Sequence, residues 1–421
     1  MSSIVKLSRR DLLTGIPLAV AGAGALPWRA FARASEPQYV ELKTKYGRLR
    51  GAKTGDLTTF KGIPYGGSVS GANRFKAAPA LQPWDGVRDA LTAGPSSPQP
   101  GPRRGDTPMT EDCLTLNIWT PAGDSRKRPV MFYNHGGGFT TGSGSSGHQD
   151  GGNLARTFDV VVVATTHRLG LMGYLYLGEP GGEEYASSGN QGMLDIRDGL
   201  RWVHENIEAF GGDPGNVMIF GESGGGAKTS ALYAMPSAAP YFHKASIESG
   251  PGIRMYPRQS AAETTLMVLD KLGIARNDWR KLLDVPVEKL MDVQNGLGQG
   301  GPLSLDNGRK GMSGNTRPGG FGPIVDGTFL PRHPFEPEPP SFSRDKPLLS
   351  GFDRDETVFF FNQQRQLDIY SLTDDQLKQR LDTAFGQNAG AVYEAYSKSR
   401  PGASPSDLYI AITTARMISV G

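Results

Sequence analysis

A serine flanked by glycines stands between a short apolar segment and a segment of small residues in the middle of the chain. The run is Gly221-Glu222-Ser223-Gly224-Gly225, with apolar residues at 217–220 before it. Gly-x-Ser-x-Gly between a strand and a helix is typical of a nucleophile elbow, in which a strained turn exposes the serine hydroxyl above the edge of a sheet. The outer glycines leave room for the strand and the helix to approach closely. We therefore expect Ser223 to attack an acyl carbon.

A second glycine-rich segment precedes this serine, with the sequence His-Gly-Gly-Gly-Phe at residues 135–139. Backbone N–H groups in such a loop can donate to the oxygen that becomes negative in a tetrahedral intermediate. The loop follows an expected strand at 130–134, where an oxyanion loop works together with the N–H of the residue after the nucleophile. The expected donors are therefore Gly137, Gly138 and Gly224. A flexible glycine turn without a catalytic role is the alternative interpretation.

Strands and helices are predicted to alternate through the centre of the chain. Residues 159–164 are a continuous β-branched run, which is typical of a strand buried on both faces of a sheet. Residues 193–210 have the apolar spacing of a helix. Further strands are expected at 46–51, 57–60, 114–119, 130–134, 217–220, 244–247 and 346–352, and further helices at 224–235 and in the stretches from 258 and from 374. This pattern predicts an α/β fold with an open, mostly parallel central sheet and helices on both faces.

Several longer segments resemble signatures of the carboxylesterase type B family, which also contains the cholinesterases. They are Phe60-Lys61-Gly62-Ile63-Pro64-Tyr65, Arg74-Phe75, Glu111 to Asn117, His135 to Phe139, Asn206 to Pro214 and Phe220-Gly221-Glu222-Ser223. The resemblance implies one α/β-hydrolase domain over residues 35–421. It also implies a serine carboxylester hydrolase that forms an acyl-enzyme on a small ester substrate. No cofactor is implied, and the histidines lack the spacing of metal ligands.

The resemblance also implies a triad acid. Residues 351–357, Gly-Phe-Asp-Arg-Asp-Glu-Thr, are similar to the family pattern Gly-x-x-x-Asp-Glu-Gly, with Thr357 in place of the last glycine. Glu356 is therefore the expected acid, which would accept the far N–H of a histidine and fix its tautomer. Asp353 and Asp355 remain the alternatives.

The histidine of the triad is where the sequence departs from the family. Triad order in this fold is serine, acid, histidine, whereas every histidine here precedes Glu356. They are His135, His148, His167, His204, His243 and His333. We expect the catalytic histidine to lie beyond Gly421 with the C-terminal part of the domain, and little turnover from the 421 residues alone. A catalytically impaired fragment and a non-catalytic binding member of the family are the alternatives to an active esterase.

Two smaller departures concern Cys113 and Gly224. Many family members pair the cysteine of the Glu-Asp-Cys-Leu motif with an earlier one, but Cys113 is the sole cysteine, and we expect it to be a free buried thiol. Gly224 stands where the family usually has alanine. We expect this glycine to leave the backbone donor intact and to make the turn slightly looser.

The first 34 residues resemble a bacterial twin-arginine export signal rather than part of the fold. They contain Arg9-Arg10, a weakly apolar stretch at 12–25 and the small-x-small end Ala32-Arg33-Ala34. We therefore expect a periplasmic or secreted protein. The apolar stretch is too short and interrupted to span a membrane. With 45 Lys and Arg against 42 Asp and Glu and no basic run, nothing indicates nucleic-acid binding, and the sequence does not indicate the oligomeric state.

Overall fold

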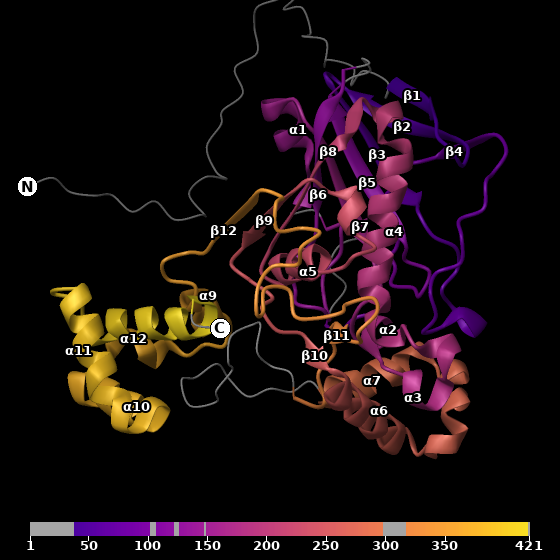
Figure 1. Cartoon of the computed structure of the whole chain (residues 1–421). Coiled ribbons are helices and arrows are strands. Elements are labelled where there is room, and N and C mark those ends of the chain that lie inside the picture. Colours follow the sequence, from indigo (N-terminus) through magenta and orange to yellow (C-terminus); the bar gives the residue numbers. More distant parts are fainter. Residues whose placement is uncertain (1–37, 102–106, 122–125, 147–148, 298–316, 420–421) are drawn as a thin grey trace, which may run out of the picture. The chain divides into compact units, whose positions relative to one another are not determined.

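The computed structural model describes residues 38–101, 107–121, 126–146, 149–297 and 317–419 (Figure 1). The expected export signal at 1–34 lies outside these residues, as do His148 and most of the glycine-rich stretch at 296–322. Residues 38–421 form one compact unit.

A single large sheet organises the described residues and positions the serine. Its strands follow the order β1-β2-β3-β5-β7-β6-β8-β9-β12, with β4 beside β2. The strands are β1 (Gln38–Lys43), β2 (Arg48–Thr54), β3 (Leu57–Pro64), β4 (Val87–Asp89), β5 (Thr115–Pro121), β6 (Arg128–Tyr133), β7 (Val161–Thr166), β8 (Gly212–Glu222), β9 (Lys244–Glu248) and β12 (Leu348–Gly351). A small parallel pair, β10 (Tyr256–Pro257) with β11 (Ile324–Val325), lies outside this sheet.

The parallel half of the sheet is the half that carries the site. Strands β7, β6, β8, β9 and β12 run parallel to one another, whereas the pairs β1–β2, β2–β3, β3–β5 and β5–β7 are antiparallel. Short turns join β1 to β2 and β2 to β3, and they allow these consecutive strands to pair antiparallel. The turn between β2 and β3 has only Gly55 and Asp56, and Gly55 has the positive φ of 61° that two-residue hairpin turns require. The predicted α/β fold with a mostly parallel central sheet is confirmed.

The two faces of β7 pack into different cores, as its unbroken burial predicts. Val161 and Val163 join the main core, which includes Leu200 of α4 (Gln191–Asn206) and Leu232 of α5 (Gly224–Tyr233). Val162 and Ala164 on the opposite face join a smaller core with Ala155 of α1 (Gly152–Phe158). Because successive side chains of a strand point to opposite faces, helices cover both sides of the sheet. In Figure 1, α1 and α4 lie on opposite sides of the strands.

The remaining helices follow the strands in two groups. The first group is α2 (Gly170–Tyr174), α3 (Gly178–Gly181), α6 (Arg258–Leu272) and α7 (Val287–Leu297). The second is α9 (Thr357–Gln363), α10 (Asp374–Phe385), α11 (Ala389–Ser399) and α12 (Pro405–Thr414), which share their own hydrophobic core around Phe361, Leu377 and Tyr409. None of the helices in the described ranges is long and apolar enough to cross a membrane.

The sequence predicted which elements exist better than where they end. The strand expected at 217–220 extends over Gly212–Glu222, and the helix expected at 193–210 ends at Asn206 and continues as a 3₁₀ turn, Ile207–Phe210. β1 was not predicted, because its side chains are mostly exposed and carry no strong alternation.

Candidate active site

Ser223 occupies the sharp turn between β8 and α5 in a strained backbone conformation. Its φ is 57° and its ψ is −122°, a region that residues other than glycine rarely adopt. A β-carbon on Gly221 or on Gly225 would overlap the carbonyl oxygen of Asn134, at the end of β6. The Ser223 N–H donates to the carbonyl oxygen of Glu248 at 2.8 Å, which ties the turn to the end of β9. The structure thus has the nucleophile-elbow geometry that the Gly-x-Ser-x-Gly pattern predicts.

The glycine loop that follows β6 lies against this turn. Gly137 and Gly138 both have positive φ, 88° and 60°. Among the hydrogen bonds of the described residues, none is donated by the N–H of either glycine. Gly224 begins α5, and the first N–H groups of a helix have no acceptor within the helix. The structure therefore brings the three expected donors together beside Ser223.

The approach of the loop to α5 depends on the glycine at position 224. A β-carbon on Gly224 would overlap the backbone nitrogen, α-carbon and carbonyl oxygen of Gly138. The expectation of a slightly looser turn stays a prediction. The space that the β-carbon of alanine would fill is occupied by the backbone of the glycine loop.

Hydrogen bonds hold the C-terminal part of the glycine loop and the residues that follow it. The carbonyl oxygen of Gly137 accepts from the Thr141 N–H at 3.1 Å. The amide side chain of Gln99 both donates to the carbonyl oxygen of Gly142 and accepts from its N–H, at 2.9 and 2.7 Å. Gly170 donates its N–H to the Phe139 carbonyl oxygen at 2.8 Å. These hydrogen bonds tie the loop to Gln99 and to the segment after β7.

A buried lysine on α5 also contacts the loop, and the sequence analysis missed it. The Lys228 side chain is fully buried, and its Nζ donates to the carbonyl oxygens of His135 and Gly138, both at 2.8 Å. Burial lowers the pKa of Lys228 from 10.5 to about 7. The signal that was available is the run Gly-Gly-Gly-Ala-Lys-Thr-Ser-Ala, in which one lysine interrupts small residues on a helix expected to pack against the sheet.

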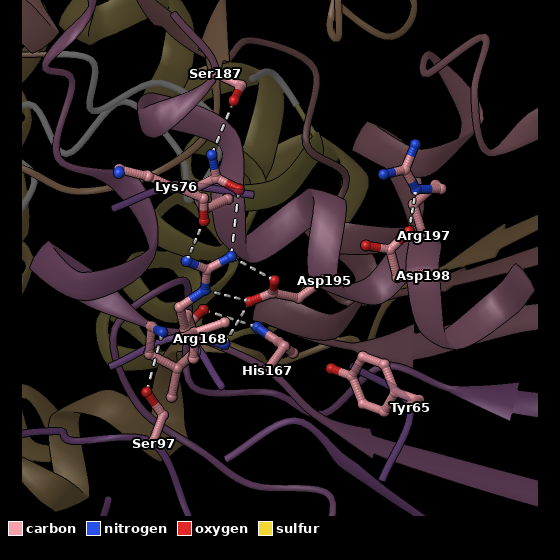
Figure 2. A network of polar contacts seen from close by, with 12 residues as sticks. Tyr65, Lys76, Ser97, His167, Arg168, Ser187, Asp195, Arg197 and Asp198 are labelled. Carbon is pink, nitrogen blue, oxygen red and sulfur yellow. Dashed lines mark hydrogen bonds and ion pairs between the residues drawn. The ribbon is translucent and has the colours of Figure 1, made fainter. Parts of the chain in front are cut away.

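Behind the loop lies a buried polar network centred on Arg168, which Figure 2 shows. The Arg168 guanidinium forms two hydrogen bonds with the Asp195 carboxylate, at 2.8 and 2.6 Å, and a third with the Lys76 carbonyl oxygen at 2.7 Å. Both charged side chains are almost fully buried. This bidentate pair fixes the segment after β7, whose His167 ring stacks on His135 at a centroid distance of 4.8 Å. The glycine loop therefore packs against a segment that a buried ion pair holds in place.

Carboxylates from the end of β8 and from the segment after β12 line the same cavity as the serine. Glu356 lies just beyond β12, and its Oε1 accepts the Asp353 N–H at 2.8 Å. Partial burial, together with the negative charges of Glu356 and Glu248, raises the pKa of Glu222, the neighbour of Ser223. Asp355 forms an ion pair with Arg354 at 2.8 Å. The expected acid thus lies close enough to interact with the elbow, and both alternative carboxylates line the same cavity.

A cavity of about 1350 Å³ contains Ser223, the glycine loop and these carboxylates. Its apolar wall is formed by aromatic side chains and methionines, which include Met109, Phe139, Tyr256, Phe321 and Phe359. Apolar cavities with a few convergent polar groups are typical of sites for small organic ligands. Within the described ranges, no cluster of His, Cys, Asp and Glu is arranged to hold a metal ion.

The histidines that the structure describes are engaged elsewhere. None of the described residues around the cavity is a histidine. His135 and His167 bond through Nδ1 to the carbonyl oxygens of Gly136 and Arg168, each at 2.9 Å. The remaining three lie outside the cavity wall: His204 is exposed on α4, His243 accepts from the Val217 N–H, and His333 accepts from the Met255 N–H.

Cys113 is a free, fully buried thiol, as the sequence predicted. Burial raises its pKa to about 12. A thiol that stays protonated at neutral pH is a poor nucleophile, so Cys113 belongs to the core rather than to the reacting groups.

Comparison with known proteins identifies the family. The family model described as "Carboxylesterase family" matches residues 38–404. The chain belongs to this family. The carboxylesterase type B resemblance of its sequence is thereby confirmed, and an ester-hydrolysing enzyme with the α/β-hydrolase fold follows from it. The N-terminal and C-terminal limits of the match enclose Ser223, the glycine loop and Glu356.

The relatives of this carboxylesterase family chain include bacterial hydrolases. It is 36% identical over 362 residues to the para-nitrobenzyl esterase of Bacillus subtilis (strain 168), covering 84% of this chain and 70% of that protein. It is 35% identical over 373 residues to the phenmedipham hydrolase of Pseudarthrobacter oxydans, covering 86% and 70%. The crystal structure of the Geobacillus stearothermophilus carboxylesterase Est55 at pH 6.2 superposes with a TM-score of 0.76 at 37% identity, covering 90% of this chain and 74% of that one.

Proposed function

We propose that this protein hydrolyses carboxylic esters through an acyl-enzyme on Ser223. The observation that carries the proposal is the strained elbow of Ser223 packed directly against the glycine loop of Gly137 and Gly138. Strain of this kind at a non-glycine residue persists where the surrounding structure over-determines it, and it clusters at active sites. Acyl transfer is the reaction in which a serine nucleophile and converging backbone N–H donors are both needed.

The proposed roles follow from the geometry. Ser223 attacks the ester carbonyl, and the N–H groups of Gly137, Gly138 and Gly224 stabilise the oxyanion. Glu356 is the proposed triad acid. Its proximity to Glu222 supports this role over Asp355, which is paired with Arg354. No described residue of the cavity wall supplies the histidine base, so we propose that acylation by these 421 residues is slow.

The charge and apolar wall of the cavity favour an ester without a negative charge as the substrate. Four carboxylates, Glu222, Asp353, Asp355 and Glu356, line it beside aromatic and methionine side chains. An anionic acyl or alcohol group would be repelled by these charges, whereas an aromatic or short aliphatic group fits the apolar wall. The name of the bacterial relative para-nitrobenzyl esterase refers to a compound with an aromatic ring and agrees with this preference.

Covalent labelling tests the nucleophile directly. We expect diisopropyl fluorophosphate to add one diisopropylphosphoryl group to the protein, seen by intact mass, and peptide mapping to place it on Ser223. Ser223→Ala should not be labelled. Ser249→Ala is the matched control, because Ser249 also lines the cavity with a positive φ of 52° but lies outside the elbow. Labelling that persists in Ser223→Ala would contradict the proposal.

Export is proposed on separate grounds. The twin arginine at residues 9 and 10 and the small-x-small end at 32–34 support a twin-arginine signal and a periplasmic or secreted location. Expressed in a bacterium with this export route, the protein should appear in the periplasm or medium with its first 34 residues removed. Replacing both arginines with lysine should retain it in the cytoplasm at full length. Equal export of the two versions would refute the signal.

A further inference from the structure

Lys228 is a buried cationic side chain whose Nζ donates hydrogen bonds to carbonyl oxygens rather than to a carboxylate. Burying an unpaired ammonium group is costly, and the lowered pKa of Lys228 reflects that cost. The chain nevertheless has lysine at this position, five residues after Ser223. The Nζ lies 5.9 Å from the centre of the Phe139 ring, so its surroundings belong to the glycine loop. The contacts of Lys228 therefore bear on the loop rather than on the sheet.

The two carbonyl groups that accept from Lys228 bracket the centre of the loop. His135 precedes Gly136 and Gly137, and Gly138 follows them. A single Nζ atom at 2.8 Å from both oxygens fixes the separation of these two peptide groups. Because Gly137 and Gly138 have no β-carbon and have wide backbone freedom, a fixed separation restricts where their N–H groups point.

Gly224 also allows the loop to lie close to α5. The loop reaches Lys228 along a path that a β-carbon on residue 224 would block, since the Gly138 backbone occupies that space. Lys228 and Gly224 lie on the same helix, and both affect Gly138. Lys228 donates a hydrogen bond to its carbonyl oxygen, and Gly224 has no β-carbon that would overlap its backbone.

We propose that Lys228 is a positioning residue of the oxyanion loop, which its Nζ holds against the first turn of α5 in the space left by Gly224. The proposal rests on the proposed function, because it assigns the loop to the oxyanion of Ser223 chemistry. Lys228 acts through the loop and does not touch the reacting atoms. The proposal predicts that Lys228 and Gly224 are energetically coupled. The β-carbon of alanine at position 224 should slow the reaction of Ser223 only while Lys228 holds the loop in place.

A double-mutant cycle on the full chain tests this coupling. The variants are Lys228→Met, Gly224→Ala and the double variant, and the readout is the maximal rate of Ser223 phosphorylation by diisopropyl fluorophosphate. Loss of one oxyanion donor slows such reactions about 10²- to 10³-fold, so we expect a loss of about 10- to 100-fold for Lys228→Met, with the half-saturating concentration unchanged. Gly224→Ala should slow the wild-type background strongly and the Lys228→Met background little. Lys228→Gln keeps two N–H donors and should retain part of the rate.

The matched control is Lys346→Met. Lys346 is a partly buried lysine whose Nζ also donates to a carbonyl oxygen, that of Phe242 at 2.6 Å, away from the loop. It should label at the wild-type rate. Wild-type labelling by Lys228→Met, or independent multiplication of the effects of Lys228→Met and Gly224→Ala, would overturn the proposal.

Amide hydrogen exchange separates failure of the inference from failure of the proposed function. In Lys228→Met, the peptide that spans residues 135–141 should exchange at least about 10-fold faster, while peptides from α6 keep the wild-type rate. If wild-type Ser223 is never labelled, the proposed function fails, and this exchange result alone decides whether Lys228 holds the loop. Unchanged exchange at 135–141 would refute the role of Lys228 whether or not Ser223 reacts.

Discussion

The imidazole rings of His135 and His167 stack with their centroids 4.8 Å apart and their planes 13° from parallel. One ring belongs to the glycine loop after β6, and the other to the segment after β7. The Nε2 atoms of both rings are buried without a hydrogen-bond partner in the described part of the protein. Burial and the positive charge of Lys228 lower the pKa of both rings well below 6.5, and Arg168 adds to this effect at His167. The stack is therefore neutral near pH 7.

This stack predicts that the protein loses stability in mild acid. Between pH 6.5 and the lowered pKa values, unfolded histidines bind protons that the folded ones do not, so the free energy of unfolding falls as the pH falls. Two such groups contribute a slope of up to about 3 kcal/mol per pH unit. Urea unfolding of wild type and His167→Gln between pH 5 and 6.5 should show a shallower slope for the variant. His204→Gln, at an exposed position of α4, is the control, and equal slopes for all three proteins would contradict the account.

The buried Lys228 predicts a second pH dependence on the alkaline side. From pH 7 towards 10.5, the unfolded chain keeps a proton that folded Lys228 loses, so the free energy of unfolding rises with pH. The slope for one group is about 1.4 kcal/mol per pH unit. It is best measured between pH 7.5 and 8.5, because the raised pKa of Cys113 acts in the opposite direction above pH 9. Wild type should gain stability across this window and Lys228→Met should not; a gain of the same size in both would exclude a buried, shifted lysine.

The Arg168 to Asp195 pair should be among the most sensitive polar contacts to substitution. Removing one partner leaves a buried charge uncompensated, so we expect Asp195→Asn to lower the free energy of unfolding by about 3 to 5 kcal/mol. Glu336→Gln breaks the exposed pair with Arg254 and should cost less than about 1 kcal/mol. Urea unfolding at pH 7.5 compares the two. Similar small losses for both variants would mean that the buried network does not support the loop.

The backbone of the glycine loop explains a further prediction, on Gly137. Its φ of 88° disfavours any side chain, and a β-carbon there would overlap the carbonyl group of Thr141. Gly137→Ala should therefore distort the oxyanion donors and slow Ser223 labelling by about 10²-fold or more. Gly55 also has a positive φ, 61°, but open space surrounds an added β-carbon there. Ser223 in Gly55→Ala should therefore be labelled at the normal rate. Normal labelling by Gly137→Ala would remove the loop from the mechanism.

Local patterns in the sequence predicted those parts of the fold and site that local sterics determine. The buried strand at β7 and the elbow at Ser223 each need particular residue types at fixed spacing, so both could be predicted. The antiparallel edge and the stack of His135 on His167 depend on contacts between segments far apart in the chain. The role of Lys228 was also hidden, because its partners are backbone carbonyl groups that leave no pattern in the side chains. The packing of Gly138 against Gly224 was missed for the same reason.

The assignment of the acid can be tested against its two alternatives. If Glu356 orients the base, Glu356→Gln should lower the rate of Ser223-dependent ester hydrolysis in the presence of added imidazole by about 10-fold or more. Asp353 and Asp355 line the same cavity, and Asp353→Asn and Asp355→Asn should lower this rate less. A larger loss for either aspartate would transfer the role of the acid to that residue.

Chemical rescue by imidazole tests the central claim most directly, that Ser223 is an esterase nucleophile in a site whose described wall contains no histidine. Initial rates of p-nitrophenyl butyrate hydrolysis are compared for wild type and Ser223→Ala, with and without imidazole, and the alanine variant corrects for hydrolysis by imidazole itself. His148→Gln tests the one histidine that the structure does not describe. A general base contributes about 10²- to 10⁴-fold, so we predict slow Ser223-dependent hydrolysis that rises at least about 10-fold with imidazole. Fast hydrolysis without imidazole, or no difference between wild type and Ser223→Ala under any condition, would contradict the account.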